Sequence, residues 1–487
     1  MIDPPMGNAR APLRAWFGLA VLMLPVLLAA MELSVLYFGM PNIESALHPS
    51  AAAEIWIIDI YGFCLAALLV TMGNLGDRIG RRGILLAGAT VFGLASVLAA
   101  SAPNSGILIT ARAFLGIGSA MLLPASLALI SNLFSDSRSR SIAVGIWTAF
   151  FAGGAAAGPV IGGTLLYEFW WGSVFLINVP VVLILLVAAP FLLPEYREPY
   201  PGPLDIVSVG LFAAAVLPLI FALKRTAAEG LDPTTAGAAL LGLGMLGGFI
   251  RRQRRLPTPL LDLSLFRRRK FAIAIAAASV GALSWSGLSY LTCTYRQSVL
   301  GCDVLDAALL GIPMAATVFA SAVAGVRIGS RLGSTCTILL ALGAAALGNL
   351  VLLATSADAG LTWFVAGSTI AGSGYGILFS FVSEAAVSAV PIYEAGAAAG
   401  ISETSLELSS GIGISLLGSL ASALFRRGGD FAPTLSETLE RADGDATIIH
   451  SARTAFVSGM HIATLVGVGA VVATAVAIWV LTKKAGR

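Results

Sequence analysis

Residues Gly73–Gly83 read GNLGDRIGRRG and form a short polar connection between two apolar runs, 53–73 and 83–102. A reduced copy, IGSRLG at Ile328–Gly333, follows 253 residues later, again between two apolar runs, with Ser330 in the place of Asp77. Two copies at matching places predict a chain made of two similar halves, 15–193 and 271–482. Each half would contain six hydrophobic helices.

The composition agrees with a chain buried in lipid. Of the 487 residues 57% are hydrophobic and only 11% are charged, and the mean hydropathy is +0.90. Soluble domains carry about 25% charged residues. This composition excludes a soluble enzyme and a disordered chain, and it predicts an all-α polytopic membrane protein.

Apolar windows of the length that a bilayer requires, about 20 residues, occur fourteen times. The first window is longer than a signal-peptide core, so we interpret it as a retained span. The windows are 15–40, 53–73, 83–102, 107–133, 141–166, 171–193, 205–223, 234–250, 271–293, 304–325, 335–355, 360–390, 396–425 and 455–482.

Lysine and arginine orient these spans. With the N-terminus inside, 21 of the 29 basic residues fall in cytoplasmic segments, as the positive-inside rule requires. Both termini are therefore predicted to be cytoplasmic. The predicted parts are a cytoplasmic N-terminus 1–14, a six-helix bundle 15–193, two inserted helices 205–250, a basic cytoplasmic loop 251–270, a six-helix bundle 271–482 and a cytoplasmic C-terminus 483–487.

Two polar segments allow more than one interpretation. The basic loop 251–270 fits a topogenic loop on an anionic inner leaflet better than a nucleic-acid site. The outer segment 426–454 is either a solvated loop or partly an amphipathic helix, because Phe431, Leu435 and Leu439 recur every four residues.

The chain resembles the major facilitator superfamily over nearly its whole length. The segment 73–85 resembles the loop signature of that superfamily, with matches at Gly73, Leu75, Asp77, Arg78, Gly80, Arg81 and Arg82. Leu108–Ala120 resembles a second signature but has Leu115 where glutamine is usual. A third signature marks antiporters and matches at Gly154, Gly158, Pro159, Gly162 and Gly163. With Trp56–Tyr61 and Phe175–Pro180, the chain resembles the fourteen-helix drug:proton antiporters.

That resemblance implies roles for these residues. Gly73, Asp77, Arg78, Gly80 and Arg81 would control conformational gating, with the Asp77 carboxylate holding the two halves together on the cytoplasmic side. The glycines of the antiporter signature would close a leak pathway. Their spacing of four also permits close helix packing without any transport role.

Ionisable groups at membrane depth are candidate functional residues, because each costs roughly 2.5–3.5 kcal/mol to insert. Away from the ends of the windows lie five acids and one base: Glu32, Asp59, Glu384, Glu403, Glu407 and Arg112. One arginine cannot pair with five carboxylates, so some must hold a proton or a cation. Counting along the spans places Glu32, Asp59 and Arg112 in the outer half of the membrane and the other three acids in the inner half or near the midplane. Asp59 also fits a structural hydrogen-bonding role, and Arg112 a structural charge partner.

We therefore predict proton-coupled efflux of lipophilic cations such as quaternary ammonium compounds, dyes and biguanide-type antiseptics across the bacterial inner membrane. The alternatives are an exporter of neutral or anionic antibiotics or metabolites and, less favoured, an uptake symporter. The proton gradient would supply the energy, without a cofactor, a bound metal, nucleic acid or an enzymatic step. The protein is expected to act as a monomer in the lipid bilayer, and its four cysteines are expected to be free thiols.

Overall fold

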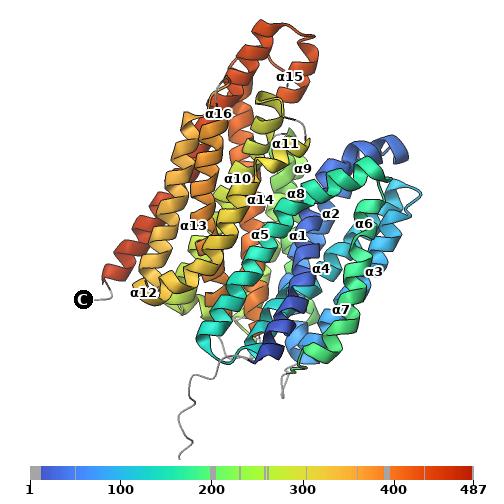
Figure 1. The fold of residues 1–487 in the computed structure, drawn as a ribbon, viewed down its shortest axis with the longest axis vertical. Coiled ribbons are helices and arrows are strands. Elements are labelled where there is room, and N and C mark those ends of the chain that lie inside the picture. The colour runs from blue at the N-terminus through green and yellow to red at the C-terminus, as the bar shows by residue number, and fades with distance from the viewer. Residues whose placement is uncertain are drawn as a thin grey trace, which may run out of the picture.

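The structure is a computed structural model that describes residues 12–49, 51–197, 205–229, 232–256, 259, 263–302, 304–358, 360–388, 395–432 and 434–484. Within these ranges every regular element is a helix. Figure 1 shows the helices in two groups, with the N-terminal half in blue to green and the C-terminal half in yellow to red. The start of the first helix and the C-terminus lie at the same end of the molecule.

The first group is built around one hydrophobic core, whose buried members run from Ala15 to Leu193. Its helices are α1 (Leu13–Leu47), α2 (Ala51–Ile79), α3 (Arg81–Ala100), α4 (Ser105–Leu133), α5 (Ser137–Glu168), α6 (Ser173–Leu176) and α7 (Asn178–Leu192). The second group comprises η1 (Leu263–Arg267), α10 (Arg269–Thr294), η2 (Tyr295–Val299), α11 (Val304–Leu309), α12 (Ile312–Val351), η3 (Leu352–Ala354), α13 (Leu361–Ser388), α14 (Ala395–Arg427), α15 (Leu435–Arg441) and α16 (Ala446–Lys484).

Between the two groups in sequence lies a helical hairpin, α8 (Ile206–Glu229) and α9 (Pro233–Gln253). A capping box at Asp232 and Thr235 starts α9. The hairpin shares a hydrophobic cluster with both halves: Phe212 and Val216 of α8 belong to it together with Phe63 of α2 and Ile401 of α14. The hairpin therefore packs on the line where the halves meet.

Each of the fourteen predicted windows overlaps a helix, although the boundaries differ. Eleven helices of the described residues are long and apolar enough to cross a membrane, and Val207–Ala222 and Ile312–Gly325 are shorter apolar helices. The window 171–193 is divided between α6 and α7, and the window 304–325 is divided between α11 and α12. The apolar composition of the sequence predicted where these segments lie. It does not predict where the helical hydrogen bonding is interrupted within a segment.

The segment Gly73–Gly83 was expected to be a loop, and this expectation was wrong. Residue Gly80 is the whole connection between α2 and α3, with a φ of 118°. Gly333 likewise breaks α12 with a φ of 78°. Such angles favour glycine strongly, and a Cβ on Gly80 would also lie 2.6 Å from the Glu195 carboxylate. Both copies of the motif are therefore one-residue joints between helices.

The outer segment 426–454 is partly helical. Helix α14 continues to Arg427, α15 is capped by the Thr434 side chain, and α16 begins at Ala446, ahead of the predicted start at 455. Leu435 is buried, and Phe431 stacks on Phe425 with ring centroids 5.0 Å apart. Of the two interpretations, the partly helical one describes this segment, and its apolar side is folded down onto the C-terminal group.

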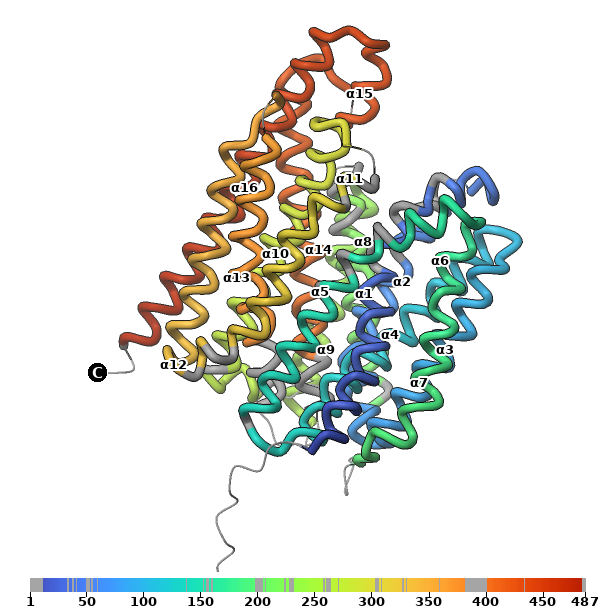
Figure 2. The backbone as a smooth tube through the Cα atoms, viewed as in Figure 1, coloured from blue at the N-terminus to red at the C-terminus, as the bar shows by residue number. Residues whose placement is uncertain are grey.

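The tube in Figure 2 shows α1 and α5 side by side near the centre of the molecule. A Cβ added to Gly154 of α5 would lie 3.0 Å from the Leu27 carbonyl oxygen of α1, and one on Gly162 would lie 3.2 Å from Val35. Gly158 is buried on the same helix, whereas Gly163 has open space around it. Two of the glycines thus allow close helix contact, and the side chain of Pro159 lies outside the described residues.

Candidate functional site

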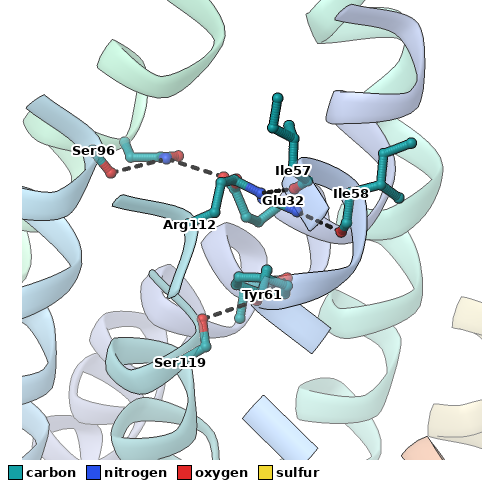
Figure 3. A network of polar contacts seen from close by, with 9 residues as sticks. Glu32, Ile57, Ile58, Tyr61, Ser96, Arg112 and Ser119 are labelled. Carbon is teal, nitrogen blue, oxygen red and sulfur yellow. Dashed lines mark hydrogen bonds and ion pairs between the residues drawn. The ribbon is translucent and has the colours of Figure 1, made fainter. Parts of the chain in front are cut away.

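An ion pair between Glu32 of α1 and Arg112 of α4 lies inside the N-terminal group (Figure 3). Both side chains are only 2% exposed. The Arg112 guanidinium also donates to the carbonyl oxygens of Ile57 (3.0 Å) and Ile58 (3.2 Å) on α2. One side chain therefore connects three helices, and its charge is balanced by a carboxylate rather than by water.

A second group of contacts completes this set of polar interactions, which is called the Glu32–Arg112 network below. The Asn178 amide of α7 donates to Glu32 Oε2 (3.4 Å) and to the Ser96 hydroxyl of α3 (3.2 Å). The Tyr61 ring lies under the guanidinium, 4.9 Å from its centroid to the Arg112 Cζ atom. The network thus draws on α1, α2, α3, α4 and α7.

Local sequence explains how Arg112 reaches this position. Asn104 caps the start of α4 by accepting from the Ile107 backbone N–H at 3.0 Å, which fixes the helix two turns before Arg112. Gly116, one turn later, has no room for a Cβ because the Tyr61 backbone of α2 lies against it. The Tyr61 hydroxyl in turn lies 2.9 Å from the Ser119 hydroxyl of α4. Close contact of α2 and α4 therefore brings the guanidinium to the α2 carbonyl groups.

The second acidic centre is on α14. Glu403 is 4% exposed, and its Oε1 atom has no hydrogen-bond partner among the described residues. The hydroxyl groups of its neighbours Ser402 and Thr404 are likewise unpartnered there. A buried, unpaired carboxylate is costly, so Glu403 is suited to hold a proton or a cationic group.

Glu407 lies one turn beyond Glu403 on α14. It is half-buried, so the helix carries two acids four residues apart. Helix α14 packs against α2 and α4. The helix that carries Glu403 and Glu407 therefore contacts two helices of the Glu32–Arg112 network.

The structure does not place the remaining two acids. Asp59 lies in α2 and Glu384 in α13, but both side chains fall outside the described residues. The described part of the chain contains no group of His, Cys, Asp and Glu suited to a metal ion, and the four cysteines are free.

The residues predicted to control gating form a compact network at the joint between α2 and α3. The Arg81 side chain is fully buried and donates to Asp77 Oδ1 (2.9 Å), to the Ala128 carbonyl oxygen (3.0 Å) and to Asn132 Oδ1 (2.7 Å). Arg78 donates to Asn74 (2.6 Å), and Gly73 is buried. Asp77 thus holds the arginine that ties α3 to the end of α4.

Replacing Asp77 by asparagine is expected to impair the conformational cycle more than the binding of substrate. Asparagine keeps the shape of the side chain but leaves the Arg81 charge without its carboxylate, and a partly broken buried ion pair is strongly destabilising. The measurement is transport turnover compared with the equilibrium binding constant for the same substrate. Unchanged turnover with weakened binding would contradict this role.

The ends of the α8–α9 hairpin are joined by contacts that the sequence did not reveal. Arg252 donates to both carboxylate oxygens of Asp205, at 2.7 and 2.9 Å. Gln253 is buried and donates to the Ser208 hydroxyl (2.6 Å), which itself donates to Asp205 (2.5 Å). These hydrogen bonds hold the pKa of Asp205, which precedes the apolar segment Val207–Ala222, well below its usual range.

The hydrogen bonds between Asp205 and Arg252, called the Asp205–Arg252 clamp below, predict a specific dependence of stability on pH. Because the pKa of Asp205 is lowered in the folded protein, its stabilising contribution is complete above the unfolded pKa, about 3.9, and is lost as the pH falls further. The melting temperature of the wild type should therefore be slightly higher than that of the Asp205→Asn variant, and the difference should be the same at pH 6 and pH 8. The margin should shrink below pH 4, and a margin that instead changes between pH 6 and 8 would show that another group carries the effect.

The comparisons with known proteins agree with this architecture. A family model described as Major Facilitator Superfamily matches residues 22–414. The multidrug efflux pump LfrA of Mycolicibacterium smegmatis is 37% identical over 500 residues, which cover 99% of each chain. The methyl viologen resistance protein SmvA of Salmonella typhimurium is 34% identical over 417 residues, covering 85% of this chain and 83% of its own. The crystal structure of the human organic anion transporter MFSD10 is similar to this chain with a TM-score of 0.60 at 14% identity. The match covers 96% of this chain and 100% of that one.

Proposed function

The chain belongs to the major facilitator superfamily of membrane transporters, and from that premise we propose that it exports lipophilic cations in exchange for protons. The observation that carries the proposal is the buried Glu403 carboxyl, whose Oε1 atom has no partner among the described residues. The multidrug efflux relative supports drug export. Methyl viologen, the compound named for the second relative, is a dication, which supports a cationic cargo.

The proposed coupling is a competition for carboxylates. A proton neutralises Glu403 in the absence of cargo, whereas a cationic drug requires the ionised carboxylate beside it. Glu407 adds a second negative charge one helical turn away, so the pair favours a cation over a neutral molecule. The Glu32–Arg112 network lies next to this site, because α14 packs against α2 and α4.

The proposed membrane arrangement has fourteen spans, with two six-helix bundles, 15–193 and 271–482, and the α8–α9 hairpin between them. Both termini are proposed to be cytoplasmic. The two described ends of the chain lie on one side of the molecule (Figure 1), as an even number of crossings requires. In this arrangement the Gly80 and Gly333 joints are on the cytoplasmic side, and alternating access follows from motion of one bundle against the other.

The charge of the cargo determines which gradient drives export. Exchange of one proton for a monovalent cation moves no net charge, so only the pH gradient contributes, about 1.4 kcal/mol per pH unit. Exchange of one proton for a dication moves one charge outward against an inside-negative potential, at a cost of about 2.3 kcal/mol per 100 mV. Two protons per dication would remove that cost.

The test is substrate-induced proton movement in proteoliposomes. Methyl viologen, a monovalent quaternary ammonium compound and a neutral drug are added in turn while the internal pH is followed with a dye, with and without a clamped membrane potential. The two cations are expected to move protons and the neutral drug is not. Proton movement with the neutral drug alone would favour the exporter of neutral compounds, and cation transport without proton movement would exclude the proposed coupling.

A further inference from the structure

The two halves of the chain can be aligned residue by residue from their helix contacts. Gly118 of α4 packs against Gly88 and Phe92 of α3, and Gly374 of α13 packs in the same way against Ala341 and Ala345 of α12. The α3 and α12 partners are 253 residues apart, the same separation as the joints Gly80 and Gly333, whereas the two packing glycines are 256 apart.

A second pair of contacts gives the same alignment. Gly116 of α4 abuts the Tyr61 carbonyl oxygen, and Gly372 of α13 abuts that of Met314, 253 residues after Tyr61. In the first helix of each half, Leu27 meets Gly154 through its carbonyl oxygen and Leu283 meets Gly413. Three independent packing contacts therefore fix which positions correspond.

This alignment shows what replaces the Glu32–Arg112 network in the C-terminal half. The charged pair becomes an uncharged one, with Leu288 at the position of Glu32 and Ser368 at the position of Arg112. The other corresponding pairs are Tyr61 with Met314, Ser96 with Asn349, and Ser119 with Tyr375.

The space that the arginine fills in one half is partly empty in the other. A cavity of about 20 Å³ is lined by the corresponding residues Leu288, Met314, Asn349, Ser368 and Tyr375, together with Trp285, Ser289, Thr292, Leu352 and Ala371. A cavity of roughly 10–15 Å³ is enough to hold one water molecule. It is far too small for a drug.

Most of the cavity surface is apolar, but Asn349, Ser368 and Thr292 contribute polar side chains that can hold a water molecule. The Asn349 amide donates to the Tyr375 hydroxyl (2.8 Å) and to the Ser284 hydroxyl (3.3 Å), so both of these hydrogen bonds use its N–H groups. Its carbonyl oxygen makes no hydrogen bond to the described residues. Thr292 and Ser368 donate to carbonyl oxygens of their own helices, which leaves the lone pairs of their hydroxyl oxygens as acceptors.

From this geometry we propose that the C-terminal half contains a binding site for a single water molecule, at the position that the Arg112 guanidinium occupies in the N-terminal half. The water donates to the Asn349 carbonyl oxygen and to a hydroxyl oxygen of Ser368 or Thr292. It completes the Asn349–Ser284–Tyr375 network as the guanidinium completes the charged one, but without a charge. The site is independent of the proposed transport function.

Radiolytic hydroxyl labelling followed by mass spectrometry tests the site, because it oxidises reactive side chains that lie beside bound water. The purified full chain in detergent offers a matched pair of reporters: Tyr375 and Tyr61 are each 1% exposed and occupy the two halves. Tyr375 is expected to be labelled several-fold faster than Tyr61, which lies under the guanidinium. Equal, slow labelling of both tyrosines would show a dry cavity and overturn the proposal.

A cavity-filling variant gives a second measurement. Ser368→Leu places an apolar side chain in the cavity and should lower the labelling of Tyr375 to the level of Tyr61, while labelling of the exposed Tyr167 stays the same. Wild-type labelling of Tyr375 in a folded Ser368→Leu protein would overturn the proposal. If this variant does not fold, the comparison of Tyr375 with Tyr61 in the wild type still decides the matter.

Discussion

Vesicles that contain the Glu32→Gln, Glu403→Gln double variant are expected to show no proton-coupled cation efflux. Glutamine has the size of glutamate but cannot bind and release a proton, so both centres lose their exchangeable charge. Glu403→Gln alone should reduce efflux with little loss of stability, because the Oε1 atom has no hydrogen-bond partner among the described residues. Efflux and internal pH are measured in the same vesicles.

The matched control is Glu440→Gln, which changes the same chemical group on the exposed surface of α15. It should transport as the wild type does. All variants are compared at equal amounts of protein in the vesicle membrane, so that a loss of folding is not mistaken for a loss of coupling. Full proton-coupled efflux by the double variant would refute the assignment of both carboxylates.

Replacing Arg112 by methionine is expected to cost about 3–5 kcal/mol of stability, the usual penalty for removing one partner of a buried ion pair. The change leaves Glu32 without its guanidinium and removes the donors to the Ile57 and Ile58 carbonyl groups. Unfolding of the purified protein in detergent by heat or denaturant provides the measurement.

The double variant Glu32→Gln, Arg112→Met distinguishes a charge effect from a packing effect. If the ion pair is the cause, the double variant should be more stable than Arg112→Met alone, because no buried charge is left unpaired. Losses that simply add up in the double variant would instead show that Arg112 acts by filling space and binding the α2 carbonyl groups.

The sequence predicted the helices and the pairing of Arg112 with an acid better than it predicted the rest of the site. Hydropathy finds apolar helices, and counting along antiparallel spans puts Glu32 and Arg112 at one depth. Asn178 lies 146 residues from Glu32, and no local pattern joins them. Only the packing of α7 against α1 and α3 does so.

Two other features were hidden for different physical reasons. Arg252 was counted among the topogenic arginines, and charge counting cannot show that one of them forms a two-point hydrogen bond to Asp205. The extent of helix at Gly73–Gly83 was underestimated because polar residues there resembled a loop. Their side chains are instead satisfied within the segment and by α4, as the hydrogen bonds from Arg81 to Asp77 and to Asn132 show.

The position of the α8–α9 hairpin has a consequence for the motion of the halves. Helix α8 touches α2 and α14, which belong to opposite bundles, through the apolar side chains of Phe212, Val216 and Ile220. Apolar contact is non-directional, so these surfaces can slide without breaking a fixed set of hydrogen bonds, while the Asp205–Arg252 clamp keeps the hairpin itself rigid. Under the proposed alternating access, the hairpin would therefore cover the contact between α2 and α14 and let the two bundles move against each other.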